Sequence, residues 1–314
     1  MGVGEECVRP VCASLARFGR IGPLDLIVSL REGIFHEIFT QHGMNLARRL
    51  LLTAVAMGMA VGWIPADRSQ QLRSPNSGSA VLSEGEDLVY EVSWTVFKLG
   101  TIHLRSHTDL SAEAHIDSYE DLPFVDLHSI HTTRMDSDFY SRASTAFELK
   151  EDGWWGLEYT YDLPNNRLLV VQTMQASPDS APRSRTPPDT IALADTNFVD
   201  GLAIAYFPRR FVQTGRSVAV PTVLYGKMGV TSFRFPAEPT AISIDAVEEP
   251  VRVREVEGST SVVGIFGMTG SFTGWFSDDV AGVPIKGTLK VLLGTVDIEL
   301  VSWKRSGWSP PLAD

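Results

Sequence analysis

The segment of residues 274–303, GWFSDDVAGVPIKGTLKVLLGTVDIELVSW, carries the strongest indication of fold class in the chain. We expect a strand to end near Ser277, followed by a polar turn at Asp278–Asp279 and a long return strand. Along the return, apolar residues hold odd positions as far as Leu293 and even positions beyond Gly294. A one-residue β-bulge at Gly294, with the glycine in a left-handed conformation, would keep both sets on one face of a sheet. A tight turn at the same glycine is the alternative.

A strict alternation over Leu88–Val96 predicts the first strand of this sheet. The apolar side chains on its core face are Leu88, Tyr90, Val92, Trp94 and Val96. A turn is predicted over Phe97–Gly100, after which Ile102 and Leu104 continue the apolar face on a second strand. The two strands are expected to form a hairpin.

Further alternating or β-branched runs predict most of the remaining strands. They are Ala114–Tyr119, Leu127–Thr133, Thr145–Lys150, Trp155–Tyr161, Leu168–Met174, Val218–Leu224, Val230–Phe235, Ala241–Val247 and Val251–Val256. A short helix is predicted to begin at Asp195 or Thr196 and to stop at Pro208. The sequence therefore predicts an all-β, mainly antiparallel fold: a curved sheet, or a partly closed β-barrel or sandwich, with one short helix.

The first 66 residues have the pattern of a leader. From Met44, the basic pair Arg48–Arg49 precedes the apolar run Leu50–Val61, which is the layout of a secretory signal peptide. The run is shorter than the roughly 20 apolar residues of a transmembrane helix, so a membrane anchor is the less favoured alternative. We expect residues 1–43 to be an extension before the true start, 44–66 a signal peptide, 67–83 a flexible tether, 84–305 a single β domain and 306–314 a tail. This organisation predicts export to the periplasm or cell envelope of a bacterium, with no transmembrane span in the mature chain.

Cysteine placement and charge exclude several functional classes. Cys7 and Cys12 both lie in the predicted extension, so the mature chain would have no disulfide, thiol nucleophile or cysteine-bound zinc. The formal net charge of −11 disfavours nucleic acid and anionic membrane surfaces as partners.

Five histidines in the predicted domain raise the question of a metal site. They are His103, His107, His115, His128 and His131. His103 and His107 would share a strand face but lie about 13 Å apart, too far to bind one zinc ion. We therefore predict a polar outer face, with no metal and no cofactor. Asp278 and Asp279 are predicted as turn residues rather than as a pair of catalytic carboxylates, and no catalytic residue is assigned.

Three segments resemble a bacterial family known as domain of unknown function 3108. Gly85–Trp94 (GEDLVYEVSW) is similar to the start of such domains, Asp200–Arg209 (DGLAIAYFPR) to their central helix, and residues 275–300 to their end. After the central aspartate this chain has Gly201, where the family usually has serine. The resemblance extends from Glu84 to Trp303 and implies architecture and export. It implies no chemistry, because the family has no established catalytic residues.

The leading functional hypothesis is non-enzymatic binding of an apolar or lipid-like ligand, or of an envelope partner, on the concave face of the sheet. The residues predicted to bind it are Tyr90, Trp94, Trp275, Asp278 and Arg209. A fully packed interior would exclude ligand carriage and leave a structural or partner-binding role. The alternatives are a hydrolase with a non-standard site near Asp278 and the histidine segment 103–131, and a purely structural envelope protein.

Overall fold

The computed structural model of the chain describes residues 74–120, 122, 125–262, 270–290 and 294–313. The predicted extension, the predicted signal peptide and the first part of the predicted tether lie outside these residues. So do residues 263–269.

The described chain consists mainly of β-strands. The first nine are β1 (Glu86–Trp94), β2 (Phe97–Ser106), β3 (Ser111–Ser118), β4 (His128–Met135), β5 (Ser141–Lys150), β6 (Gly153–Asp162), β7 (Arg167–Gln175), β8 (Ser184–Arg185) and β9 (Asp189–Ala192). The remaining strands are β10 (Ser217–Leu224), β11 (Lys227–Arg234), β12 (Thr240–Ile244), β13 (Val247–Thr260), β14 (Gly270–Ser277), β15 (Pro284–Lys290) and β16 (Thr295–Arg305). Helical structure is limited to α2 (Gly78–Val81) and the 3-10 turns η1 (Leu163–Asn165), η2 (Ala203–Ala205) and η3 (Phe207–Arg210).

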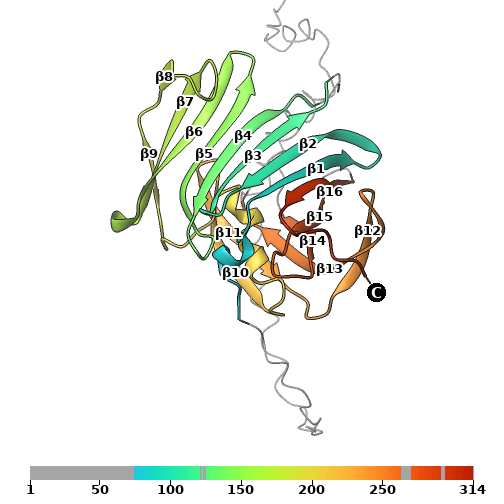
Figure 1. The fold of residues 1–314 in the computed structure, drawn as a ribbon. Helices are drawn as coiled ribbons and strands as arrows, with labels where there is room; N and C mark the ends of the chain where they lie inside the picture. Colours follow the sequence, from blue (N-terminus) through green and yellow to red (C-terminus); the bar gives the residue numbers. More distant parts are fainter. Residues whose placement is uncertain (1–73, 121, 123–124, 263–269, 291–293, 314) are drawn as a thin grey trace, which may run out of the picture. The chain divides into compact units, whose positions relative to one another are not determined.

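The strands form one sheet with antiparallel ladders, in the order β10-β11-β13-β14-β15-β16-β1-β2-β3-β4-β5-β6-β7-β8. The long strand β13 also pairs with β12, and β7 also pairs with β9. Figure 1 shows β16 beside β1, where the two halves of the chain meet. The described strands at the two ends of the path do not pair with each other, so the sheet is open. The predicted fold class is confirmed.

The first hairpin has the predicted core face but a different turn. Leu88, Tyr90 and Val92 are buried, as the alternation requires. The reversal uses only Thr95 and Val96, because Trp94 pairs directly with Phe97. Thr95 has a φ of 55°, the left-handed conformation that a two-residue hairpin turn uses. Val96, which the alternation placed in the core, therefore lies at the tip and is 85% exposed.

The C-terminal segment contains one strand more than predicted. β14 ends at Ser277 as expected, but the return consists of β15 and β16, which pair with each other from Lys286–Glu299 to Lys290–Thr295. The chain thus reverses direction at Gly294, whose φ is 91°. The bulge interpretation is wrong, and the turn alternative explains why the apolar set changes parity there. Val291 and Leu293, which were expected on the core face, lie outside the described residues.

The helical segments also differ from the prediction. No α-helix starts at Asp195 or Thr196, because the side chain of Asp200 accepts hydrogen bonds from the backbone N–H groups of Leu202 and Ala203 and starts the turn there. The chain then forms η2 and η3, two 3-10 turns. The one short α-helix among the described residues is α2, inside the predicted tether, where the Ser77 hydroxyl caps its first turn.

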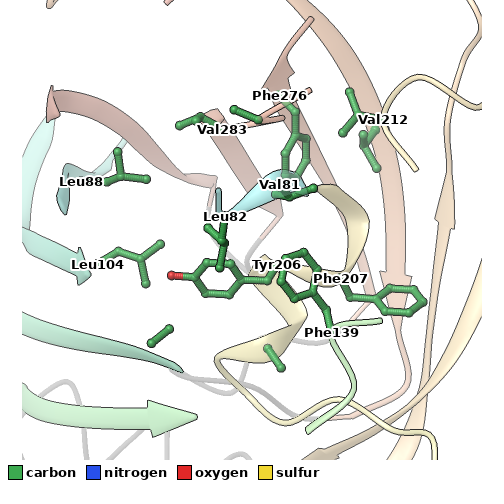
Figure 2. Packing of buried hydrophobic residues seen from close by; sticks show 14 of the residues in the cluster. Val81, Leu82, Leu88, Leu104, Phe139, Tyr206, Phe207, Val212, Phe276 and Val283 are labelled. Atoms are coloured by element: carbon green, nitrogen blue, oxygen red, sulfur yellow. The ribbon is translucent and has the colours of Figure 1, made fainter. Parts of the chain in front are cut away.

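The core fills the space enclosed by the sheet. Figure 2 shows Val81 and Leu82, from the end of α2, beside Tyr206 and Phe207 from the 3-10 segment. These side chains pack against inner-face residues of both halves of the sheet, such as Leu88 and Phe276. The packed part of the chain therefore begins before Glu84, the predicted start of the domain.

The predicted tail beyond residue 305 is also in contact with the domain. Trp308 packs edge to face on Trp303, with ring centroids 6.2 Å apart, and Leu312 forms a β-bridge with Val251. These contacts extend the packed structure past the last strand.

Candidate functional site

The residues predicted to bind a ligand do not meet at an open site. Tyr90 is 4% exposed, and its hydroxyl donates a hydrogen bond to the backbone carbonyl of Pro284 at 3.0 Å. Trp275 donates from Nε1 to a Glu255 carboxylate oxygen at 3.3 Å. Trp94 lies near the tip of the first hairpin, with its ring centroid 6.3 Å from that of Phe97. These aromatic residues belong to the packing of the sheet.

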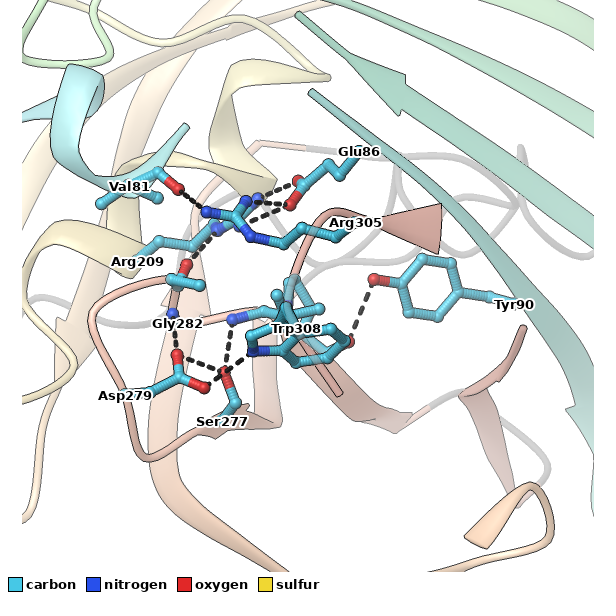
Figure 3. A network of polar contacts seen from close by, with 12 residues as sticks. Val81, Glu86, Tyr90, Arg209, Ser277, Asp279, Gly282, Arg305 and Trp308 are labelled. Atoms are coloured by element: carbon cyan, nitrogen blue, oxygen red, sulfur yellow. Dashed lines mark hydrogen bonds and ion pairs between the residues drawn. The ribbon is translucent and has the colours of Figure 1, made fainter. Parts of the chain in front are cut away.

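Arg209 is part of a buried ion cluster. Its guanidinium contacts both carboxylate oxygens of Glu86 and donates from Nε to the carbonyl of Ala281 at 3.0 Å. Arg305 donates to the same carboxylate at 2.8 Å and to the carbonyl of Val81 at 2.8 Å (Figure 3). The side chains of Arg209 and Glu86 are fully buried. The cluster of Arg209, Glu86 and Arg305 therefore joins the end of α2, β1, the 3-10 segment and the β14–β15 turn. Arg209 does not face a ligand.

Opposing effects set the ionisation of this cluster. Burial alone would raise the pKa of the Glu86 carboxyl, but the charges and hydrogen bonds of Arg209 and Arg305 hold that pKa below its ordinary value. Glu86 is thus a carboxylate with two cationic partners. Such a cluster is costly to break, because removal of one partner leaves a buried charge uncompensated.

Asp278 and Asp279 are structural, as the turn prediction requires. Asp278 accepts from Arg254 Nε at 2.7 Å and pairs with Arg252 at 3.2 Å. Asp279 accepts from the backbone N–H of Gly282 at 2.9 Å and from Trp308 Nε1 at 2.8 Å. These bonds fix the β14–β15 connection and leave no free carboxylate to act as a base.

Four of the five histidines lie on the outer face or in loops. His103 pairs with His115 across β2 and β3, and His128 donates a hydrogen bond from Nδ1 to the Asp117 carboxylate at 2.8 Å. Among the described residues, no group of three or more histidine, aspartate, glutamate or cysteine side chains could hold a metal ion. His131 is different, because it lies on the inner face of β4.

His131 lines a pocket of about 110 Å³ on the inner face of strands β4–β7. The residues in register across this face are Ser129 and His131 on β4, Ala146 and Glu148 on β5, Trp155 and Leu157 on β6, and Gln172 on β7. They share a face because cross-strand partners in an antiparallel ladder point the same way. The same face continues to Thr133, whose hydroxyl contacts the buried carboxylate of Asp200, so the pocket lies where the inner face leaves the core.

Tyr225, from the turn between β10 and β11, forms the opposite wall. The turn is held over the sheet by a hydrogen bond from the Gly226 N–H to the hydroxyl of Tyr159 on β6, at 3.2 Å. Tyr225 and Gly226 have φ values of 46° and 72°, as a two-residue turn requires. Val223, just before the turn, packs with Leu168 and Val170 of β7.

The polar residues of the pocket have distinct roles. Burial lowers the pKa of His131 to about 4, and the Glu148 carboxylate opposes this shift only in part. His131 is therefore neutral at physiological pH, and its Nε2 lies 3.2 Å from the hydroxyl of Ser129. Glu148 is paired with the partly exposed Lys150. Trp155 is 40% exposed, and its Nε1 donates to Asp152 at 2.8 Å, which fixes the indole orientation.

Sequence reasoning found only part of this site. The alternation over 155–161 places Trp155 and Leu157 on one face, and the histidine segment includes His131. Tyr225 was not identified, because only tertiary structure brings the β10–β11 turn onto β6. The available signal was the dipeptide Tyr225–Gly226 between two predicted strands, an unusual place for a large aromatic residue.

These features define a class of protein: an open antiparallel sheet that curves around a packed core and leaves a small aromatic pocket on its inner face. A solved structure with a similar fold is the beta-barrel-like protein of domain of unknown function DUF1849 from Brucella abortus. The match has a TM-score of 0.51 and 10% sequence identity, and covers 71% of this chain and 97% of that chain. At this identity the likeness concerns the fold alone. No protein-family model and no curated protein matches the sequence. No described helix has the length and hydrophobicity needed to cross a bilayer.

Proposed function

We propose that the chain is an exported bacterial envelope protein that binds a small ligand group, without catalysis, in the pocket between β4–β7 and Tyr225. The observation that carries the binding role is the placement of Trp155 and Tyr225. Both are large aromatic residues, 40% and 41% exposed, and both line the same pocket. Exposed aromatic side chains that surround a concave surface offer a large contact area to a ligand.

Carriage of a whole lipid inside the sheet has no such support. The space near Tyr90 is filled by Val81, Leu82 and Tyr206, which are all nearly inaccessible to solvent. The pocket itself, at about 110 Å³, is smaller than the roughly 300–1,000 Å³ typical of sites that enclose a drug-sized molecule. The proposed ligand is therefore a small molecule or a head group, with any larger part remaining outside the pocket.

Native mass spectrometry of the protein from its own envelope tests the binding role. We expect a bound small molecule on the wild type that is lost in Trp155→Leu and kept in Trp154→Leu. Trp154 is the matched control, because it precedes Trp155 on β6 and points to the other face of the sheet. Equal retention in both variants would contradict the assignment of the pocket.

Export rests on the leader pattern and on the resemblance to domain of unknown function 3108. N-terminal sequencing of the protein from its native host should find a mature start between Val61 and Asp67. A mature protein that retains residues 1–43 would contradict both the start at Met44 and the proposed route.

A second candidate function, a hydrolase, is favoured by the contact between Ser129 and His131. Two features oppose it: Ser129 is only 4% exposed, and a histidine with a pKa of about 4 is a weak general base at neutral pH. A fluorophosphonate probe, which labels activated serines, distinguishes the two functions. We expect no label on Ser129; labelling that disappears in Ser129→Ala and His131→Asn would support the hydrolase instead.

A further inference from the structure

We propose that the group bound in this pocket is an organic ammonium ion, held by the rings of Trp155 and Tyr225 and by the carboxylate of Glu148. This inference rests on the proposed binding function and specifies its ligand chemistry. The shared chemistry is a small cation with apolar substituents, either a free amine such as choline or the head group of a lipid.

The charge of the lining favours a cation. Glu148 is the ionised side chain among the residues that line the pocket, since His131 is neutral at physiological pH. The other polar liners, Ser129 and Gln172, are uncharged. A carboxylate beside apolar and aromatic walls attracts a cation more strongly than it would in open water.

The two aromatic residues suit the same ligand. Ammonium and alkylammonium groups are attracted to the electron-rich faces of tryptophan and tyrosine, and such aromatic cages are a recurrent way to bind methylated ammonium ions. Trp155 is held by Asp152 and the Tyr225 turn by Tyr159, so both walls are positioned before a ligand arrives. Preorganised walls reduce the entropy lost on binding.

Lys150 provides an internal example of the proposed contact. Its ammonium group pairs with the Glu148 carboxylate, so that carboxylate is accessible to an ammonium ion. The Lys150 side chain is 49% exposed, and an ion pair of this kind contributes little stability because both groups can be solvated. An external ammonium ion can therefore replace the Lys150 ammonium group at Glu148, while the Lys150 side chain turns into solvent.

The size of the pocket agrees with a small head group. A volume of about 110 Å³ corresponds to roughly four water molecules at about 30 Å³ each. A methylated ammonium group is of this order, whereas a planar cofactor or an acyl chain is larger. The formal net charge of −11 also favours the approach of cations over anions.

Chemical-shift titrations test the proposal, with the backbone amides of Gly156 and Leu157 as reporters. The probes are choline and its neutral isostere 3,3-dimethylbutan-1-ol, which has the same shape without the charge. We expect choline to shift both amides with an affinity at least tenfold higher than that of the isostere. Phosphatidylcholine and phosphatidylglycerol vesicles then distinguish the sources. Binding to the former alone indicates a lipid head group, and binding of choline without vesicle binding indicates a free amine.

Three variants, with two control variants, relate the affinity to the named residues. Glu148→Gln and Trp155→Leu should each weaken choline binding about tenfold, whereas Trp154→Leu should leave it unchanged. Lys150→Gln should strengthen binding several-fold, because it removes the internal competitor. Lys304→Gln on β16 changes the net charge equally and serves as its control, with no effect expected. Urea unfolding of each variant establishes that the fold is retained.

The outcomes separate this inference from the proposed function. If choline and the isostere bind equally and Glu148→Gln has no effect, while Trp155→Leu abolishes binding of both, the pocket binds ligands but not by cation recognition. That result overturns the inference and keeps the proposed function. If neither probe shifts the reporter amides and no small molecule is found by native mass spectrometry, both are overturned.

Discussion

The inner face of β1–β3 and the pocket end of the inner face of β5–β7 have the same alternation, but their inward side chains differ in solvent exposure. On β1–β3, Leu88, Leu104 and Ala114 are at most 5% exposed, because the end of α2 and the 3-10 segment pack against them. At the pocket end of β5–β7, Trp155 is exposed and Leu157 is half-buried. Further along β7, Leu168 and Val170 are again at most 6% exposed, because Val223 packs with them. Alternation determines which side chains point inward, whereas the covering segments determine whether an inward side chain is core or binding surface.

The largest expected effect is at the buried ion cluster, on the covered β1–β3 side of the sheet. Arg209→Met leaves the buried carboxylate of Glu86 with Arg305 as its remaining cationic partner. We expect a loss of about 3–5 kcal/mol in the free energy of unfolding, measured in urea. Arg234→Met is the control, because the Arg234–Glu257 pair is about half exposed and should cost at most about 1 kcal/mol. Similar losses in both variants would mean that the buried cluster does not hold the covering segments on the sheet.

A pair of leucine truncations tests the two inner faces directly. Leu88→Ala removes a fully buried side chain and should cost about 2–5 kcal/mol. Leu157→Ala removes a half-buried side chain at the pocket and should cost about 1 kcal/mol, because water already reaches it. Urea midpoints that show equal losses would indicate that the pocket end of β5–β7 is as fully covered as β1–β3.

His131 lies at the boundary between the two regions, and acid titration tests how far it is buried there. Its pKa of about 4 in the folded protein is below the value of about 6.5 expected in the unfolded chain. The unfolded state therefore binds more protons between pH 6.5 and 4, and the stability contributed by neutral His131 is lost as pH falls through this window. We expect a loss on the order of 3 kcal/mol, and His131→Asn should remove this part of the slope. Parallel pH profiles of the wild type and the variant would show that His131 is not buried.

The smallest expected effect is at Gly294, in the reversal between β15 and β16, outside both inner faces. Gly294 has a φ of 91°, and an added Cβ would lie 3.0 Å from Thr95 Cγ2. Gly294→Val should therefore cost about 1–2 kcal/mol or slightly more. Gly287→Val is the control, since the nearest atom to an added Cβ there is the Thr273 oxygen at 3.9 Å. Equal effects in urea would indicate that Gly294 is not held in a left-handed conformation.

Much of the sheet was predictable, because strand periodicity is a local property. The predicted strands over 114–119, 127–133 and 155–161 each fall within or beside an observed strand, and the inward residues follow from their parity. The errors are at reversals. The Thr95–Val96 turn and the turn at Gly294 have no strong turn dipeptide, and a period-2 pattern cannot distinguish a bulge from a hairpin when only parity changes.

The site was less predictable because its walls come from distant segments. Arg209 and Tyr90 were chosen as ligand residues because they are polar or aromatic, and the fold uses both inside the core. Tyr225 lines the same pocket as Trp155 because the β10–β11 turn is anchored on Tyr159. No local pattern contains the anchoring of this turn, so the sequence could suggest an inner face but not the part of it that stays open.

The pairing of β1 with β16 has a consequence for the order of folding. Glu86 and Arg305 are 219 residues apart, so the first strand gains one of its two neighbours only after nearly the whole chain is available. Contacts of such sequence separation slow folding, because the loop between them must lose its entropy before the pairing is formed. A chain synthesised or translocated from its N-terminus therefore keeps an unpaired edge on β1 until the last strand is released. Truncation before β16 should leave that edge free to pair with other chains rather than produce a smaller stable domain.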